Sequence, residues 1–275
     1  IQTSELAKLF MVVYLSGYLA RRSREIRTHL WGFIKPMIIL VMMVVLLLLE
    51  PDFGAVVVLM SAALGMMFLA GVRLSQFLVL IVVSLIAIAG LAVSQPYRMQ
   101  RLVTFMDPWA KENVFDSGYQ LTQALIAFGR GEWWGVGIGN SVQKLFYLPE
   151  AHTDFVYAIL AEETGLLGSI VVISLFFLLT WRIMHIARQA EKKEQFFSAY
   201  VCYGIAFLFS AQALINIGVN TGLLPTKGLT LPLLSYGGSS LIVCCVSLAM
   251  VLRVDYESKC LPQAASSKKT AEVVE

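Results

Sequence analysis

One part of the chain concentrates side chains that could do acid–base chemistry beside a long apolar run. Glu150, His152 and Asp154 precede that run, and Glu162 and Glu163 lie inside it. A carboxylate at the edge of an apolar region is partly desolvated, and this raises its pKa towards that of a general base. Asp154 stands at the boundary itself and is therefore the first candidate for a catalytic group.

A structural role explains Asp154 equally well at this point. An aspartate or threonine just before an apolar helix commonly caps the first N–H groups of that helix. His152 could be a partner of Asp154, a metal ligand or an interfacial residue. One histidine and one aspartate two residues apart are a weak metal signal, and the four cysteines lack metal-ligand spacing, so we predict no protein-held metal site.

Glu162 and Glu163 need a polar environment. Glu162 follows Asp154 by eight residues, which places the two within about 80° on a helix and at most ~12 Å apart along its axis. Carboxylates within an apolar segment are costly and face a protein interior or a cavity. Two roles stay open: pairing with a polar group of another helix, or lining a polar cavity or proton route.

A second polar stripe lies further along the chain. Gln212, Asn216 and Asn220 recur every four residues and share one helix face. Hydrogen bonding between helices explains such a stripe, and lining a cavity is the alternative. The segment 221–240 that follows is rich in proline and glycine and holds Lys227 as its one cation. We predict a re-entrant or cavity-lining segment, with Lys227 either at the lipid surface or against a phosphate.

The composition is that of a membrane protein. Of 275 residues, 58% are hydrophobic and 14% are charged, whereas soluble domains carry about 25% charged residues. The net charge of +3 gives no reason to expect nucleic acid as a partner. Apolar runs of about 20 residues predict an all-α polytopic membrane protein. Seven spans are expected, near residues 4–20, 33–49, 54–71, 74–94, 155–181, 197–219 and 236–253.

Lysine and arginine predict the orientation of these spans. They gather in the connections 20–35 and 182–196 and in the tail 254–275, whereas the turn at 50–52 has none. The positive-inside rule places the basic connections and the C-terminus in the cytoplasm. The first span would then start outside, and the sequence does not begin with Met. We therefore expect further helices upstream in the natural protein.

Residues 95–154 are expected to form a large extracytoplasmic loop, too long for a simple connection. Apolar residues at helical spacing predict a short amphipathic helix over 119–128 within it. The glycine-dense run 129–140 contains a GxGxG pattern, but no strand precedes it and no βαβ unit surrounds it. A dinucleotide site is therefore not predicted.

Several motifs resemble the SEDS family. They are Pro149-Glu-Ala-His-Thr-Asp-Phe155, Gly118-Tyr-Gln, Phe128-Gly-Arg-Gly and the run from Leu224 to Ser240. The opening Gln2-Thr-Ser-Glu-Leu-Ala-Lys8 is similar too, with Thr3 where the family usually has proline. Asn140-Ser-Val-Gln-Lys144 resembles the cell-division members more than the elongation members. The resemblance covers essentially the whole chain.

This resemblance implies a ten-helix fold of which these would be the last seven helices. It implies a peptidoglycan glycosyltransferase that polymerises lipid II at the division site, in the bacterial cytoplasmic (inner) membrane. Its partners would be a class B penicillin-binding protein, which is the septal transpeptidase, and other divisome membrane proteins. The essential aspartate of the family corresponds to Asp154, which becomes the predicted general base.

The implied chemistry assigns further candidate residues. A carboxylate takes the proton of the attacking sugar hydroxyl, and the leaving lipid pyrophosphate needs cations or a metal. A divalent cation, Mg²⁺ or Mn²⁺, could serve there, and no other cofactor is expected. Candidate substrate-binding residues are Lys227, Lys144, Glu150, His152, Arg98 and Arg101, and candidate cavity-lining residues are Glu162, Gln212, Asn216 and Asn220.

Two other classes of function stay open. A lipid II transporter (flippase) would use Glu162, Glu163 and the amide stripe as its route. A non-catalytic scaffold would recruit the transpeptidase through the surfaces of the second to fourth spans, around Gly65 and Gly71.

Overall fold

The structure is a computed structural model that describes residues 2–50, 52–93, 103–110, 113, 118–226 and 228–260. Within these ranges the chain is helical and contains no β-strand. The candidate residues Arg98, Arg101 and Lys227 lie outside the described residues, as does the predicted tail beyond residue 260.

The helices follow the apolar runs of the sequence. Four precede the long loop: α1 (Thr3–Thr28), α2 (Leu30–Leu49), α3 (Phe53–Leu69) and α4 (Leu74–Val93). The loop holds α6 (Tyr119–Gly131) and a short π-helix, η1 (Gln143–Tyr147). Three helices follow it: α7 (Val156–Lys192), α8 (Phe196–Asn220) and α9 (Gly238–Cys260). The predicted amphipathic helix is confirmed as α6, and each predicted span coincides with one helix.

Four helices in the described part of the chain are long and apolar enough to cross a membrane, namely α2, α7, α8 and α9. α3 has only 17 residues and is shorter than these four helices. α1 carries charged residues near both ends. A multi-pass membrane protein is therefore shown, whereas the count of seven spans stays a prediction.

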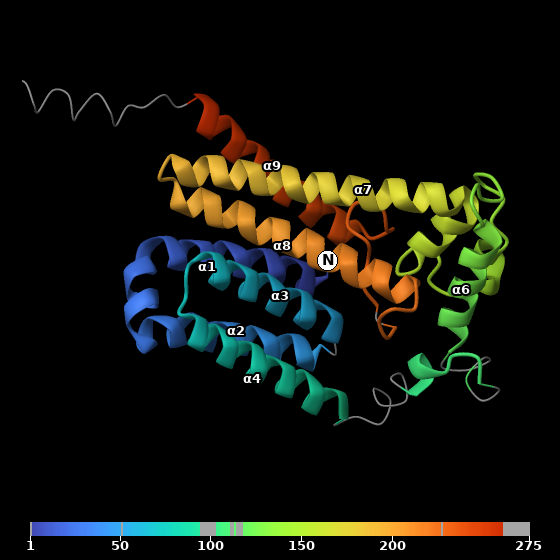
Figure 1. Cartoon of the computed structure of the whole chain (residues 1–275), viewed down its shortest axis with the longest axis horizontal. Helices are drawn as coiled ribbons and strands as arrows, with labels where there is room; N and C mark the ends of the chain where they lie inside the picture. The colour runs from blue at the N-terminus through green and yellow to red at the C-terminus, as the bar shows by residue number, and fades with distance from the viewer. Residues whose placement is uncertain are drawn as a thin grey trace, which may run out of the picture.

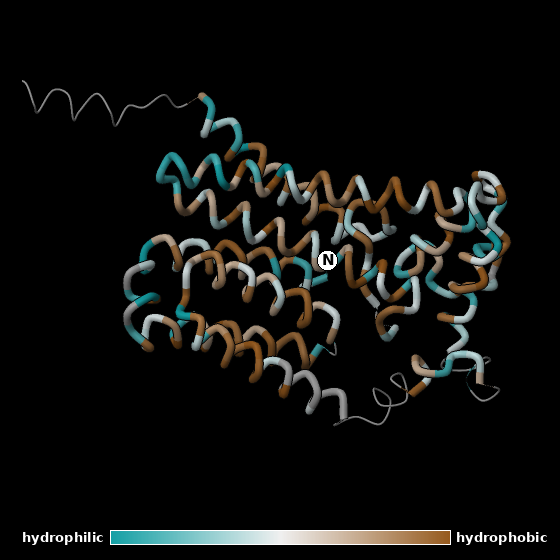
Figure 2. Tube along the Cα trace, in the orientation of Figure 1, coloured by the Kyte–Doolittle hydropathy of each residue, from teal (hydrophilic) through white to brown (hydrophobic). Residues whose placement is uncertain are grey.

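α8 is the central helix of the bundle. It packs against α1, α3 and α7 (Figure 1), and its side chains are buried along most of its length. Small residues allow the close approach: a β-carbon at Gly65 of α3 would lie 2.7 Å from the Phe207 ring. By contrast, most apolar side chains of α2 and α7 are exposed. Both helices contain long hydrophobic stretches, drawn in brown in Figure 2. Such outward apolar faces suit lipid or neighbouring helices.

The basic connections lie together at one end of the bundle. The α1–α2, α3–α4 and α7–α8 connections and the C-terminal end of α9 meet there (Figure 1). Arg27 Nε donates to the Ala70 carbonyl at 3.0 Å, and Lys193 donates to the carbonyl of Ser258. α9 continues to Cys260, so the predicted tail begins as helix. α6 and η1 lie towards the opposite end, and which end faces the cytoplasm stays a prediction.

Candidate active site

Asp154 lies in the turn that leads into α7, and its side chain does not cap that helix. The N-cap residue of α7 is Phe155, and no side chain at that position bonds the helix. Thr153, the other capping candidate, donates its hydroxyl to Glu150 Oε2 at 2.7 Å. The capping interpretation of the sequence is therefore wrong, and the carboxylate of Asp154 is left for other chemistry.

The surroundings of the Asp154 carboxylate raise its proton affinity. Burial, helped by the nearby Glu150 and Asp52 carboxylates, raises the pKa of Asp154 from 3.8 to about 6. None of the described residues donates a hydrogen bond to this carboxylate. Its Oδ2 lies against Gly228, where an added β-carbon would be 3.1 Å away. A carboxylate with a pKa near 6 is ionised at neutral pH yet remains a useful base.

Two amides of α8 hold the backbone of this turn. Asn216 Nδ2 and Asn220 Nδ2 each donate to the Asp154 carbonyl oxygen at 2.9 Å. Asn220 Oδ1 also accepts from the Ala158 amide at 3.0 Å. Both asparagines are buried, and a buried amide without partners would cost about 1–3 kcal/mol. The turn is therefore anchored to the central helix.

The same stripe holds the segment after α8. Asn216 Nδ2 donates to the Leu229 carbonyl at 2.5 Å, and Gln212 Nε2 donates to the Thr230 carbonyl at 3.0 Å. Gln212 Oε1 accepts from Lys8 Nζ at 3.2 Å. Hydrogen bonding thus accounts for all three amides, as one interpretation of the stripe expected. Their role in lining a cavity stays a prediction.

The proline- and glycine-rich segment folds over the Asp154 turn. Ser235 Oγ donates to the Thr153 carbonyl at 2.5 Å, and the Tyr236 amide donates to the His152 carbonyl at 2.8 Å. The His152 side chain is exposed and faces a pocket of about 620 Å³. The rest of its lining consists of Val156, Leu233, Leu234, Ser235, Tyr236, Gly237, Gly238 and Leu241. The turn therefore has open space beside it.

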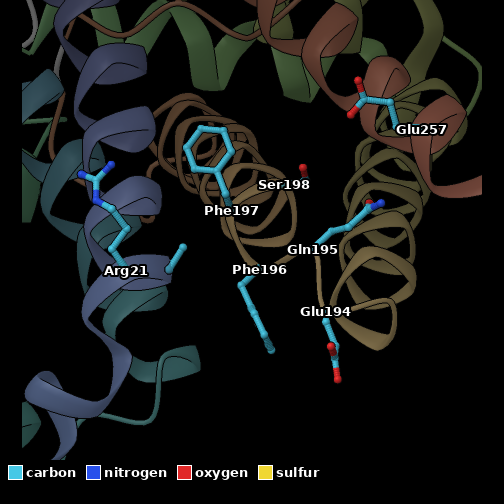
Figure 3. A pocket seen from close by; sticks show the side chains of 8 residues that line it. Arg21, Glu194, Gln195, Phe196, Phe197, Ser198 and Glu257 are labelled. Atoms are coloured by element: carbon cyan, nitrogen blue, oxygen red, sulfur yellow. The ribbon is translucent and has the colours of Figure 1, made fainter. Parts of the chain in front are cut away.

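A second pocket, of about 430 Å³, lies at the basic end of the bundle (Figure 3). Arg21 of α1, Glu257 of α9 and residues 194–198 at the start of α8 line it. It mixes both charge signs with two phenylalanine rings. This pocket belongs to the end of the fold away from Asp154.

Glu162 binds the backbone of the loop that precedes the turn. Its side chain is completely buried. It accepts from Ser141 Oγ at 2.5 Å and from the Val142 and Gln143 amides at 3.3 and 3.2 Å. Arg130 Nη1 forms an ion pair with Glu162 Oε1 at 3.3 Å. All these partners satisfy Glu162 within the fold.

Glu163 forms an ion pair with Lys144. The Lys144 Nζ lies 2.6 Å from Glu163 Oε1 and donates to the Gly139 carbonyl at 2.7 Å. Lys144 is thus held by Glu163 of α7, 19 residues later in the sequence, and by the backbone of its own loop. A role for Lys144 in binding substrate stays a prediction that requires this ion pair to open.

α7 is broken at Gly165, which the sequence analysis did not foresee. Gly165 has φ +69° and ψ −165°, a conformation that only glycine adopts readily. The loop pairs with the broken helix through backbone hydrogen bonds. The Val136 amide donates to the Glu162 carbonyl, and the Leu166 amide donates to the Glu132 carbonyl. A β-carbon at Gly135 would lie 2.2 Å from the Glu163 carbonyl oxygen. The glycine-dense run 129–140 was the available signal, and it reflects this close backbone contact.

Asp52 was also missed by the sequence analysis. Its carboxylate caps α3 by accepting from the Ala55 amide at 2.9 Å, and its charge raises the pKa of Asp154. The local signal for the cap, an aspartate directly before an apolar run, was present. Nothing local indicated that this cap lies near Asp154.

The sequence model of the FtsW/RodA/SpoVE family, described as cell cycle protein, matches residues 1–260. The chain belongs to this family. The resemblance to SEDS proteins drawn from the sequence motifs is thereby confirmed.

Relatives of known name give the same result. The chain is 61% identical over 258 residues to a probable peptidoglycan glycosyltransferase FtsW of Hahella chejuensis, covering 94% of this chain and 64% of that protein. It is 60% identical over 259 residues to the FtsW of the same description from Pseudomonas fluorescens, covering 94% of this chain and 63% of the relative. The chain thus spans somewhat less than two thirds of the length of these two relatives.

Solved structures share the fold. One neighbour belongs to a peptidoglycan synthase complex studied for the coordination of polymerization and crosslinking, with a TM-score of 0.73 and 29% identity over 94% of this chain and 70% of that one. Another is the rod shape determining protein RodA of Thermus thermophilus, with a TM-score of 0.64 and 28% identity over 94% and 66% of the two chains. The all-α arrangement described above is therefore that of SEDS proteins.

Proposed function

We propose that this chain forms the catalytic part of a peptidoglycan glycosyltransferase that polymerises lipid II into glycan strands during septal wall synthesis. The observation that carries the proposal is the Asp154 carboxylate. It is partly buried, it has a pKa of about 6, and none of the described residues bonds it. The names of the FtsW relatives support the same class of reaction.

Asp154 would act as a general base. Its carboxylate takes the proton from the sugar hydroxyl of the acceptor while that oxygen forms a bond to the anomeric carbon of the donor. The bond from that carbon to the lipid pyrophosphate breaks, and the pyrophosphate leaves with the electron pair. One base and one activated leaving group suffice for such an inverting displacement, so Glu150 and His152 are proposed only to assist binding and positioning.

Cations are proposed to stabilise the leaving pyrophosphate. Lys227 precedes Gly228 in sequence, and Gly228 lies against the Asp154 carboxylate. Lys227 is therefore the first candidate, followed by Lys144, Arg98 and Arg101. Among the described residues no group of three or more His, Cys, Asp or Glu side chains could hold a metal ion. Mg²⁺ or Mn²⁺ would thus have to rely on the phosphate oxygens of the substrate, and no step is assigned to it.

The cellular setting is also proposed. The protein would lie in the inner membrane at the division site, with its basic end and C-terminus in the cytoplasm and Asp154 on the outer side. Its partner would be a class B penicillin-binding protein of the septal transpeptidase type, along with other divisome proteins. A fold shared with a chain of a peptidoglycan synthase complex supports such a partnership.

The contacts of Glu162 and Glu163 argue against a transporter. Glu162 is bonded by Ser141, Val142 and Gln143, and Glu163 is paired with Lys144. Neither carboxylate needs a moving ion or substrate for a partner. A scaffold role makes no use of the perturbed Asp154.

The test is polymerisation of labelled lipid II by the purified full-length protein in detergent, with its penicillin-binding partner present and absent. Glycan chains are expected, although no membrane remains across which a lipid could be moved. An absence of polymer under both conditions would contradict the proposal. Loss of lipid movement in vesicles on Glu162→Gln, with polymerisation intact, would favour the transporter instead.

A further inference from the structure

Two asparagines of the central helix converge on a single backbone atom. Asn216 and Asn220 stand one turn apart on α8, and both side-chain amides lie 2.9 Å from the Asp154 carbonyl oxygen. The relative exposure of the two residues is 1% and 0%. Buried amides are retained only where their hydrogen bonds are made. Here both side-chain amides donate to the backbone carbonyl of the residue whose carboxylate is the candidate base.

The remaining contacts of Asn220 tie the same turn to α7. Asn220 Oδ1 accepts from the amide of Ala158 in the first turn of α7 at 3.0 Å. It thereby supplies from another helix the capping oxygen that Phe155 cannot provide. Asn220 Nδ2 also donates to Asn216 Oδ1 at 3.2 Å, which fixes the two amides relative to each other.

The remaining contact of Asn216 reaches the opposite wall of the site. Its Nδ2 also donates to the Leu229 carbonyl at 2.5 Å. Leu229 follows Gly228, the residue against which Asp154 Oδ2 lies. The pair of asparagines therefore sets the distance between the turn that carries the base and the segment that covers it.

We propose that Asn216 and Asn220 are positioning residues that aim the Asp154 carboxylate at the acceptor hydroxyl. The inference rests on the proposed function of Asp154. No described residue bonds the carboxylate itself, so its direction depends on the backbone from which it projects. Only two side-chain torsions separate the carboxylate from the clamped peptide unit. A displacement of about 1 Å at a reacting group can cost about 100-fold in rate.

The test compares kinetics of the full-length protein carrying Asn216→Leu or Asn220→Leu, each of which removes the amide at nearly constant volume. Labelled lipid II is the substrate. The expected result is a fall in kcat of about 10- to 100-fold with KM changed by less than about threefold. Thr221→Val is the matched control, because the Thr221 hydroxyl donates to Ile217 at 2.9 Å within α8 and has no contact with Asp154. It should retain the kcat of the unsubstituted protein.

A second comparison separates positioning from general loosening of the fold. In the Asp154→Glu background the carboxylate is already displaced by one methylene, so Asn220→Leu should lower kcat by less than about threefold there. An equal fold-loss in both backgrounds, or a loss that appears in KM alone, would overturn the positioning role. Should Asn220→Leu fail to fold, Asn220→Gln keeps an amide but shifts it; the same split between kcat and KM is expected, and an unchanged kcat would contradict the inference.

The outcomes distinguish this inference from the function on which it rests. If Asp154→Asn polymerises lipid II at full rate, the proposed base is wrong. If Asp154→Asn abolishes polymerisation while both leucine variants keep full kcat, the base stands and the positioning role alone fails.

Discussion

The side-chain amide of Asn220 lies 2.9 Å from the carbonyl oxygen of Asp154, although 66 residues separate the two in sequence. This contact joins the candidate base to the most buried helix of the bundle. A reacting group supported from a rigid element keeps its geometry better than one held only by a loop. The fold thus places Asp154 on a turn while giving that turn the rigidity of α8.

The pH dependence of polymerisation should report the raised pKa of Asp154. Because the base must be ionised, kcat/KM should rise with pH through an acid limb near pH 6. Glu150→Gln removes a charge that raises this pKa, so its acid limb should move to lower pH. A pH–rate profile of both proteins measures the shift. Glu132→Gln, in the same loop, serves as control, and an acid limb that stays in place on Glu150→Gln would contradict the assignment.

Neutralising Asp154 should stabilise the protein at neutral pH. The folded state raises the pKa of Asp154 from 3.8 to about 6, so the ionised carboxylate destabilises the fold above pH 6, and this cost disappears as the pH falls below 3.8. Asp154→Asn should therefore raise the thermal unfolding midpoint by a few degrees at pH 7.5 and leave it unchanged near pH 4. Thermal unfolding in detergent at the two pH values measures this. A lower midpoint at pH 7.5 would show that the carboxylate is stabilising.

The break in α7 should depend on glycine. Gly165→Ala forces a β-carbon to within 2.5 Å of the Gly135 amide nitrogen, at a φ of +69°. The backbone strain alone costs about 1–3 kcal/mol, and the contact requires the loop to move. A lower unfolding midpoint is expected. Gly129→Ala is the control, because nothing lies within 4 Å of its β-carbon position; equal midpoints for the two variants would contradict the described contact.

The two neighbouring glutamates should differ in their contribution to stability. Glu162 is completely buried and holds the Ser141 hydroxyl and two backbone amides. Glu162→Gln should cost about 1–3 kcal/mol, because a neutral amide leaves part of these donors poorly matched. Glu163 and Lys144 are partly exposed, and such pairs contribute less. Denaturation of Glu162→Gln and Glu163→Gln in parallel tests the order, and a larger loss for Glu163→Gln would reverse it.

Local patterns in the sequence predicted most of the helices. The helical spacing of Leu121, Leu125 and Phe128 identified α6, and apolar length identified the segments that became α1–α4 and α7–α9. Asp154 was found because a carboxylate stood at the edge of an apolar run. These signals lie within one helix or turn, where periodicity and desolvation act directly.

Contacts between distant residues were beyond such patterns. The stripe of Asn216 and Asn220 was recognised, but its convergence on Asp154 depends on how α8 packs against the start of α7. The break at Gly165 depends on backbone hydrogen bonds from residues 132–137, and a long apolar run predicted one unbroken helix there. Lys144 was an available cation in the sequence, whereas the fold pairs it with Glu163.

The most direct measurement of the central claim is the rate of lipid II polymerisation by Asp154→Asn in the purified full-length protein. Asparagine keeps the size of the side chain and loses only the proton acceptor. Removal of the general base should lower kcat by about 100-fold or more, while binding of lipid II is retained and the unfolding midpoint at pH 7.5 does not fall. Asp107→Asn, an exposed aspartate of the same loop, should keep the full rate. Full activity of Asp154→Asn would contradict the account.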